Sequence, residues 1–565
     1  MSKEFALSKN TFGGIDQRAG CSTSFDLMPE LCNFFIDERG ALKKRNGYRR
    51  LAGESVEMTA SKLWNVGGSV FMTVGNELYK LVDGEFINLG GTTIGAHSVL
   101  GFAGKIYALA GNFYTIDGNT LAPEFGYVPL VLTACAPNGA GTVLESPNML
   151  NNRRRVRYNG DGNSCTYVLP EKNLNAVISV TLNGETAEEG YTAALKEGTV
   201  TFDTAPEDGI NNVEICYAAR NNPTTHKMIV ECHYGLVFEN RLFLYGNPSY
   251  PNYLFHSAVA DGIPCGEYFT ETDYHIFDEP VISLSSCFNR LIVFLKNSAF
   301  YSYSQLNVDS KGNARTTFPV YELNSSKGSL IEGNAVSYGN MPVTLCEDGL
   351  NRWTSTEIAD ERTASVFSHR VYGYMDKAKS EIKDLRIMNR KSRSELWLIL
   401  SDGVLIYNYG LDLFYFYDIG GIRAVCEYED GIVFSLKDGG TYLFTEGEST
   451  DDGKLIKATF STPFCTFSSP HKLKSLNCVG LTVESGKAFV GDLTVKRGNL
   501  SESNQLNGRL CLPEIAHDAC RRIKARLPLK RFYSCKITLS TCSDGVYISG
   551  LYLFGKELDG NLRNN

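Results

Sequence analysis

The chain has 565 residues, of which 43% are hydrophobic and 21% charged, so it contains enough apolar material for several domains. A formal net charge of -8 disfavours a nucleic-acid surface that depends on bulk positive charge. The 30 tyrosines, 31 phenylalanines and 54 glycines indicate short strands and tight turns rather than long helices.

The cysteine pattern and the absence of long apolar runs indicate a protein that folds in a reducing cytoplasm. The 16 cysteines are scattered singly from Cys21 to Cys542 without a CxxC pair, so we expect reduced, mostly buried thiols. The start MSKEFALSKN lacks the apolar stretch of a signal peptide. The apolar runs at 291–295 and 396–400 are far shorter than the roughly 20 residues of a membrane helix, and we expect no transmembrane segment.

Residues 1–55 form an N-terminal segment with unusual glycine and cation placement. Gly13 and Gly14 permit backbone conformations that other residues avoid. Arg45 and Gly47 flank Asn46, which predicts a turn with a cation at its rim, followed by Tyr48. The surrounding lysines and arginines favour either a solvated strand edge or an interface to an acidic partner or DNA phosphates. We expect this segment to complete a β-propeller or to form an assembly interface.

A repeated sequence pattern occurs along the chain, and the ten-residue segment FENRLFLYGN at 238–247 is one copy of it. Each copy has a polar turn, an apolar run, a second turn and a strand that is often aromatic, which predicts a β-hairpin covered on both faces. The seven copies begin at Val66, Phe102, Phe238, Cys287, Ser337, Ser392 and Tyr428.

The spacing of the copies predicts a β-propeller of six to eight blades. Apart from one interval of about 136 residues, successive copies lie roughly 36–54 residues apart, which brackets the 40–50 residues of one blade. The first blades are expected in 56–127 and the others in 218–447. A long β-sandwich, or several stacked ones, is the alternative.

The long interval predicts an inserted β-sandwich domain over residues 128–217, because polar turns recur there every 8–12 residues. It contains RRRVR, the densest basic run of the chain. On a strand, Arg153, Arg155 and Arg157 would share one face and Arg154 and Val156 the other. The run is either the exposed side of a strand or a contact to DNA or an acidic protein.

The second half of the chain is also predicted to be almost entirely strands and loops. Asp261–Tyr274 and Gln305–Arg315 are long polar segments, which we interpret as loops that could act as a gate. Short helical turns are expected only near Glu357–Arg362 and Tyr374–Lys383. The repeat ends near Gly447, and new strands predict a C-terminal β-sandwich at 448–565, joined by the acidic linker TEGESTDDGK.

Catalytic and metal motifs are not found in this sequence, so we expect neither an enzyme nor a cofactor. There is no GxSxG, GxxxxGK[ST] or HExxH pattern. Cys511, His517 and Cys520 lack the paired spacing of a zinc site. The hairpin CEDGLNRW at 346–353 is similar to the Asp-box turn of sialidase-like propellers, which leaves a glycosidase as an alternative.

The N-terminal pattern, TFGGIDQRAG followed by ELCNFFIDERGALKKRNGYRRL, is the part of the chain that resembles a known family. Its F-G-G and G-x-L-x-x-R-x-G-Y elements are similar to the N-terminus of the tail nozzle proteins (tail tubular protein B) of short-tailed bacteriophages and of related tail hubs. The inserted segment also looks like small β-domains of phage structural proteins. The cysteine count and the position of the insert depart from a compact nozzle.

The resemblance implies a structural protein of the virion tail, made in the host cytoplasm. In that family, copies form a ring, usually a hexamer, below the tail adaptor and in reach of tail fibres. The ring encloses a channel that retains double-stranded DNA and passes it without reading its sequence. The candidate assembly or channel residues are Gly13, Gly14, Arg45, Gly47, Tyr48, Arg153, Arg154, Arg155 and Arg157. The alternative is a propeller that binds or cleaves glycans or proteins at a cell surface, with a pocket on one face.

Overall fold

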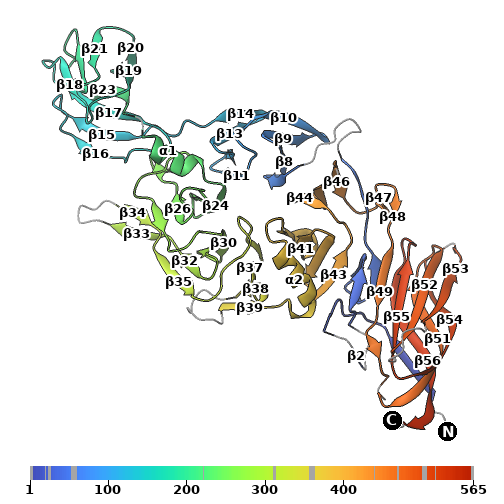
Figure 1. Cartoon of the computed structure of the whole chain (residues 1–565). Coiled ribbons are helices and arrows are strands. Elements are labelled where there is room, and N and C mark those ends of the chain that lie inside the picture. The colour runs from blue at the N-terminus through green and yellow to red at the C-terminus, as the bar shows by residue number, and fades with distance from the viewer. Residues whose placement is uncertain are drawn as a thin grey trace. The chain divides into compact units, whose positions relative to one another are not determined.

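A computed structural model describes residues 4–18, 21–22, 27–51, 60–220, 222–308, 314–354, 363–437, 439–467, 470–498, 505–515 and 517–561. The chain is mainly β (Figure 1). It divides into two compact units, one of Met1–Met72, Leu81–Phe86 and Glu322–Asn565, the other of Thr73–Lys80 and Ile87–Tyr321. No helix among the described residues is long and apolar enough to cross a membrane.

Among the described residues, seven antiparallel groups of four strands each contain one copy of the repeated phrase as the central hairpin. Five are separate sheets, while the last two belong to an 11-stranded and a six-stranded sheet, and the seventh takes its fourth strand from the N-terminal residues 48–50. A meander of this kind is the unit from which propeller blades are built. The first four are β7 (Lys62–Val66), β8 (Ser69–Val74), β9 (Glu77–Val82) and β10 (Glu85–Gly91); β11 (Ser98–Phe102), β12 (Lys105–Leu109), β13 (Phe113–Asp117) and β14 (Thr120–Pro123); β24 (Tyr234–Phe238), β25 (Arg241–Tyr245), β26 (Tyr253–His256) and β29 (Tyr274–Ile276); and β30 (Ser283–Cys287), β31 (Arg290–Phe294), β32 (Ala299–Ser302) and β35 (Val320–Asn324). The other three are β36 (Val336–Tyr338), β37 (Met341–Cys346), β38 (Gly349–Trp353) and β39 (Ala364–Val366); β40 (Arg386–Arg390), β41 (Glu395–Leu400), β42 (Gly403–Asn408) and β43 (Leu413–Tyr417); and β44 (Ile422–Tyr428), β45 (Gly431–Leu436), β46 (Thr441–Phe444) and β6 (Tyr48–Arg50).

The turn between β24 and β25 shows why the phrase forms a hairpin. Glu239 and Asn240 both have positive φ angles, 42° and 57°, which is the backbone of a two-residue turn that matches strand twist. Phe238 then pairs with Arg241, and the strand that follows is buried from Leu242 to Tyr245. Its residues contribute to two apolar clusters, so both faces of the sheet are covered, as the sequence predicted.

Two small hairpins interrupt these sheets at the segments that were predicted to be loops. β27 (Val259–Ala260) pairs with β28 (Ile263–Pro264), and β33 (Gln305–Val308) pairs with β34 (Ala314–Thr317). Each forms a separate two-stranded sheet, and in the first the polar tip Asp261–Gly262, with positive φ at both residues, turns the chain back. The Gln305–Arg315 segment is therefore largely a β-ribbon rather than a loop.

The inserted domain has a core of its own, formed around Val156, Tyr158, Tyr167, Val213 and Ile215. Its strands lie between residues 130 and 218. A six-stranded sheet and a three-stranded sheet share its strands β15 (Leu130–Cys135), β16 (Thr142–Val143), β17 (Arg153–Gly160), β18 (Thr166–Val168), β19 (Ala176–Leu182), β20 (Glu185–Ala187), β21 (Tyr191–Ala194), β22 (Thr199–Phe202) and β23 (Gly209–Ala218).

The C-terminal strands form two sheets over an apolar core, and N-terminal strands are built into both. In these sheets β1 pairs with β56, β5 also pairs with β56, and β3 pairs with β49. The strands are β1 (Glu4–Lys9), β2 (Cys21–Ser22), β3 (Glu30–Cys32), β4 (Phe34–Ile36), β5 (Leu42–Lys44), β49 (Ala458–Ser461), β50 (Phe464–Cys465), β51 (Lys472–Glu484), β52 (Phe489–Arg497), β53 (Gln505–Leu512), β54 (Cys520–Phe532), β55 (Cys535–Thr541) and β56 (Tyr547–Asn561).

The predicted acidic linker and helical turns have mixed outcomes. Part of the linker forms β47 (Thr450–Asp451) and β48 (Lys454–Leu455), and β47 pairs with β6. Helix α2 (Tyr372–Ser380) confirms the turns expected near 374–383, whereas Glu357–Arg362 lies outside the described residues. Helix α1 (Pro223–Val230) was not predicted; Asn222 caps it and Pro223 begins it.

Candidate functional site

Arg45 lies in the interior, where Asp451 accepts hydrogen bonds from its Nη1 at 2.8 Å and its Nη2 at 2.6 Å. Its side chain has no exposed surface, its Nε donates to Asn33 at 2.7 Å, and its Nη2 also donates to Asp418 at 3.1 Å. Burial lowers the pKa of Arg45, but hydrogen bonds and charges from both carboxylates outweigh it and raise the pKa above its usual value. The predicted turn with a cation at its rim is wrong, because carboxylates from distant segments enclose this guanidinium.

The other N-terminal candidates also make contacts within the chain. Gly14 has φ of +78°, and a Cβ there would come within 2.8 Å of the Phe414 carbonyl oxygen, so this position requires glycine. Gly13, by contrast, has no positive φ. A Cβ on Gly47 would lie 1.9 Å from the Thr450 carbonyl oxygen, and the ring of Tyr48 packs edge-on against aromatic neighbours 5.0 and 5.2 Å away.

The arginine run lies on β17 with the alternation that the sequence predicted. Val156 faces the core of the inserted domain, while Arg155 and Arg157 both reach Glu214 on the neighbouring β23, at 3.8 and 2.6 Å. Arg154, on the other face, pairs with Glu171. Three of the four guanidinium groups are therefore compensated by carboxylates of the same domain, which reduces the positive charge available to a polyanion.

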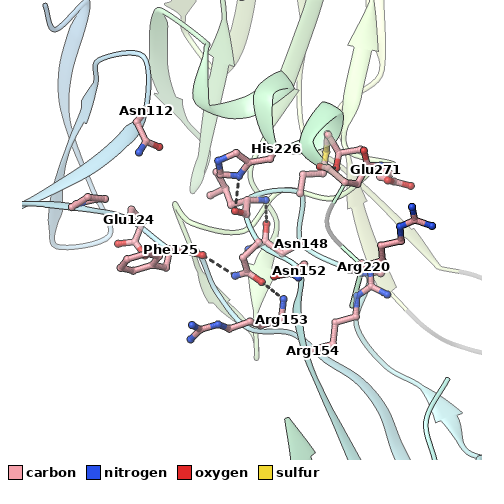
Figure 2. Close-up of a pocket in the computed structure, with 17 residues that line it drawn as sticks. Asn112, Glu124, Phe125, Asn148, Asn152, Arg153, Arg154, Arg220, His226 and Glu271 are labelled. Carbon is pink, nitrogen blue, oxygen red and sulfur yellow. Dashed lines mark hydrogen bonds between the residues drawn. The ribbon is translucent and has the colours of Figure 1, made fainter. Parts of the chain in front are cut away.

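Arg153 and Arg154 line a pocket of about 520 Å³ in the unit that contains the inserted domain (Figure 2). Its walls come from the end of the second four-stranded sheet, from connector 147–152, from residues that follow β23 and from helix α1. The polar and aromatic side chains that line it are Asn112, Glu124, Phe125, Asn148, Asn151, Asn152, Arg153, Arg154, Arg220, Asn222, Thr225, His226 and Glu271.

Asparagine side chains hold the floor of this pocket in place. The amide nitrogen of Asn151 donates to three successive carbonyl oxygens, of Phe125, Gly126 and Tyr127, at 2.9–3.0 Å. Asn148 donates to the carbonyls of Tyr127 and Glu267 at 2.8 and 2.7 Å. These bonds join the connector to two other segments, so the pocket is formed before any ligand arrives.

Charges of both signs are distributed around the pocket. In the view of Figure 2, Arg153, Glu124 and Phe125 lie on the left, and Arg154, Arg220 and Glu271 on the right. Burial lowers the pKa of Arg154, and Tyr217 and Glu271 oppose that effect only in part. The Nε atom of Arg154 is buried without a hydrogen-bond partner in the described part of the chain.

His226 contributes a ring that is held by a hydrogen bond to the backbone. Its Nδ1 lies 2.8 Å from the carbonyl oxygen of Leu150, so Nδ1 donates this hydrogen bond and Nε2 is the ring nitrogen left for other partners. The histidine comes from helix α1, where it lies one turn after the capping Asn222.

The sequence found two residues of this pocket, Arg153 and Arg154, and missed Arg220, His226 and Phe125. An N-P pair that opens a helix was the available signal for His226, whereas nothing local marks Arg220, which stands alone after β23. Among the described residues, no group of three or more His, Cys, Asp or Glu side chains is placed to hold a metal ion.

No family model and no curated protein matches the chain. Solved structures with partial similarity include the computationally designed protein Ika8 (9% identity, TM-score 0.32, covering 70% of this chain and 99% of that one). Sqt1 of Saccharomyces cerevisiae has 10% identity and a TM-score of 0.31 over 71% of this chain and 99% of its own. The extracellular domain of BT4673 from B. thetaiotaomicron has 10% identity and a TM-score of 0.20 over 89% of this chain and 79% of that one. At these TM-scores the similarities do not define the fold.

Proposed function

We propose that the protein is a structural component of a phage tail whose seven sheets are the blades of a propeller and whose copies assemble into a ring around a DNA channel. The N-terminal resemblance motivates this proposal. The seven successive meanders support the propeller, because sheets with two apolar faces are best covered by packing around an axis.

The proposal that copies assemble rests on the exposed apolar residues of the β33–β34 ribbon. Every residue of β33 is exposed, and Leu306 and Val308 keep 66% and 61% of their surface on one face of the strand. A two-stranded ribbon is marginally stable in water and has no larger sheet to join here. Exposed apolar side chains on such an element favour an interface with another subunit.

The net charge fits a conduit. Each copy carries a formal charge of -8, so a ring of copies that presents acidic residues to its lumen would repel DNA phosphates and let the duplex slide. The N-terminal candidates contribute by stabilising the subunit rather than by contacting DNA, because Arg45 and Gly47 are enclosed by the chain.

Mass photometry and negative-stain microscopy of the purified full-length chain test the ring. We expect closed oligomers, and the double variant Leu306→Ser/Val308→Ser should shift them to monomers with the same thermal unfolding midpoint. Gln305→Ser, on the opposite face of the same strand, is the matched control and should leave the ring intact. A wild-type protein that stays monomeric at all concentrations, alone and with tail adaptor, would refute the proposal.

A second candidate function is a surface-binding propeller. The preformed pocket beside Arg153 and Arg154 favours it, because it combines a volume of about 520 Å³ with fixed polar groups and one exposed ring, the features of a small-molecule site. A wild-type protein that remains monomeric and binds a surface ligand would support this candidate over the ring.

A further inference from the structure

The pocket between connector 147–152 and helix α1 holds two guanidinium groups that the chain does not use. Arg153 and Arg220 are both exposed, and no ion pair of either side chain occurs within the described part of the chain. Arg154 adds a buried Nε atom without a partner. A planar oxyanion matches such groups, because a guanidinium presents paired donors in the geometry of a carboxylate.

The acidic side chains of the same pocket limit how much negative charge the ligand with this oxyanion can carry. Glu124 and Glu271 line the walls, and Glu171 outside the lining already compensates Arg154, so the two remaining cations share the pocket with two carboxylates. This balance disfavours a polyanion such as DNA or a polyphosphate, which would be repelled at two points. It suits a ligand with one negative charge and several hydroxyl groups, whose hydrogens the carboxylates accept.

Phe125 supplies an exposed aromatic ring at the pocket. Its ring keeps 73% of its surface exposed at the rim of a pocket that is otherwise polar. The face of an aromatic ring carries partial negative charge and attracts the C–H groups on the apolar face of a sugar ring. The hydrogen bonds of Asn151 to the carbonyls of Phe125 and Gly126 fix the backbone that carries this ring.

We propose that this pocket binds a saccharide that carries a carboxylate. Arg220 receives the carboxylate, Phe125 packs against the sugar ring, and Glu124, Glu271 and His226 Nε2 accept hydrogen bonds from hydroxyl groups. Such a ligand is either a free acidic sugar or a unit of a surface polysaccharide. The site lies within one compact unit, so it does not depend on ring assembly.

An array of immobilised saccharides tests the class of ligand with the full-length protein. The array carries uronic-acid and sialic-acid saccharides beside the same saccharides after their carboxyl groups have been reduced to alcohols. We expect binding to carboxylated members only, with free sugar and polymer compared by competition to separate the two sources. No binding to any carboxylated saccharide would overturn the proposal, as would equal binding to the reduced forms or competition by inorganic phosphate.

Calorimetric titration of the best-bound saccharide tests the residues. Arg220→Gln should weaken binding about 10-fold or more, equivalent to about 1.4 kcal/mol, because it removes a charge-assisted hydrogen bond to the carboxylate. Phe125→Ala should weaken binding to a similar degree, whereas Lys196→Gln, which removes an exposed cation of the inserted domain outside the pocket, should change nothing. Wild-type affinity in both pocket variants would place the ligand elsewhere and overturn the proposal. Ring formation, measured in parallel, distinguishes this failure from failure of the assembly.

Discussion

Arg45 and Asp451 form a bidentate ion pair in the interior, with nitrogen–oxygen distances of 2.8 and 2.6 Å. The pair joins the segment between β5 and β6 to β47, and the carboxylate of Asp418 contacts the same guanidinium. A buried charge that loses its partner keeps the cost of desolvation without the compensating attraction.

We therefore expect Asp451→Asn to lower the free energy of unfolding by about 3–5 kcal/mol, because it leaves the Arg45 guanidinium buried with a weaker partner. Urea unfolding followed by tryptophan fluorescence measures the effect. Glu448→Gln is the control: it removes the carboxylate of a half-exposed pair with Arg49 at 3.5 Å, which should cost about 0–1 kcal/mol. Equal midpoints for the two variants would contradict the assigned role of the buried pair.

Gly47 should not tolerate any side chain. In Gly47→Ala the new Cβ would overlap the Thr450 carbonyl oxygen at 1.9 Å, so β47 must move away from β6 and the unfolding midpoint should fall sharply. Gly91→Ala is the comparison, since a Cβ there meets nothing within 4 Å and the φ angle is not positive. The unfolding midpoints of both variants, measured by heating, test this expectation. A G47A protein as stable as the wild type would show that the close approach of Gly47 to Thr450 is not required.

Acid should destabilise the sheet that contains His256. Burial lowers the pKa of His256 to about 4, although Asp273 opposes the shift, while His275 and Arg241 add to it. The folded-state pKa lies below the unfolded value of about 6.5, so stability present above pH 6.5 is lost as the pH falls toward 4, by on the order of 3 kcal/mol.

The variant His256→Phe isolates this contribution, because the ring already packs against Phe243 and Phe318 and phenylalanine has no proton to bind. Urea midpoints at pH 7 and pH 4.5 should differ less in the variant than in the wild type. Identical losses in both proteins would assign the acid sensitivity to other groups.

Removal of residues 306–314, replaced by a two-glycine bridge, should leave the unfolding midpoint close to that of the wild type. The β33–β34 ribbon forms a sheet separate from β30, β31, β32 and β35, so its loss takes no strand from the larger sheet. Circular dichroism during heating measures the unfolding midpoints of the deletion variant and the wild type. A large drop in the midpoint would mean that the ribbon is required for the subunit, and an unchanged oligomer would argue against its place in the ring.

The central hairpins could be predicted from sequence because their information is local. A turn that tolerates positive φ, such as Glu239–Asn240, and the apolar run after it determine a hairpin without reference to the rest of the chain. The inserted domain was recognisable for the same reason. Arg153 and Arg154 were found because four arginines in five residues are conspicuous.

The burial of Arg45 could not be predicted, because its partners Asp418 and Asp451 are distant in sequence and are brought to it only by long-range strand pairing. Arg220 and Phe125 illustrate the same limit at the pocket, where four separate segments converge. The basic stretch around Arg45 looked like a surface since lysine and arginine are seldom buried; Lys44 is also 6% exposed, with Asp544 as its partner.

The pairing of β6 with β46 and of β1 with β56 has a consequence for biosynthesis. A ribosome releases the first fifty residues long before it has made their partners, about 400 or more positions later, so these residues must wait without their native neighbours. The emerging polypeptide therefore completes these sheets only after β46 and β56 have been made. Premature termination would expose the N-terminal strands as well as remove the C-terminal ones, which offers the cell's proteases a direct way to discard incomplete copies.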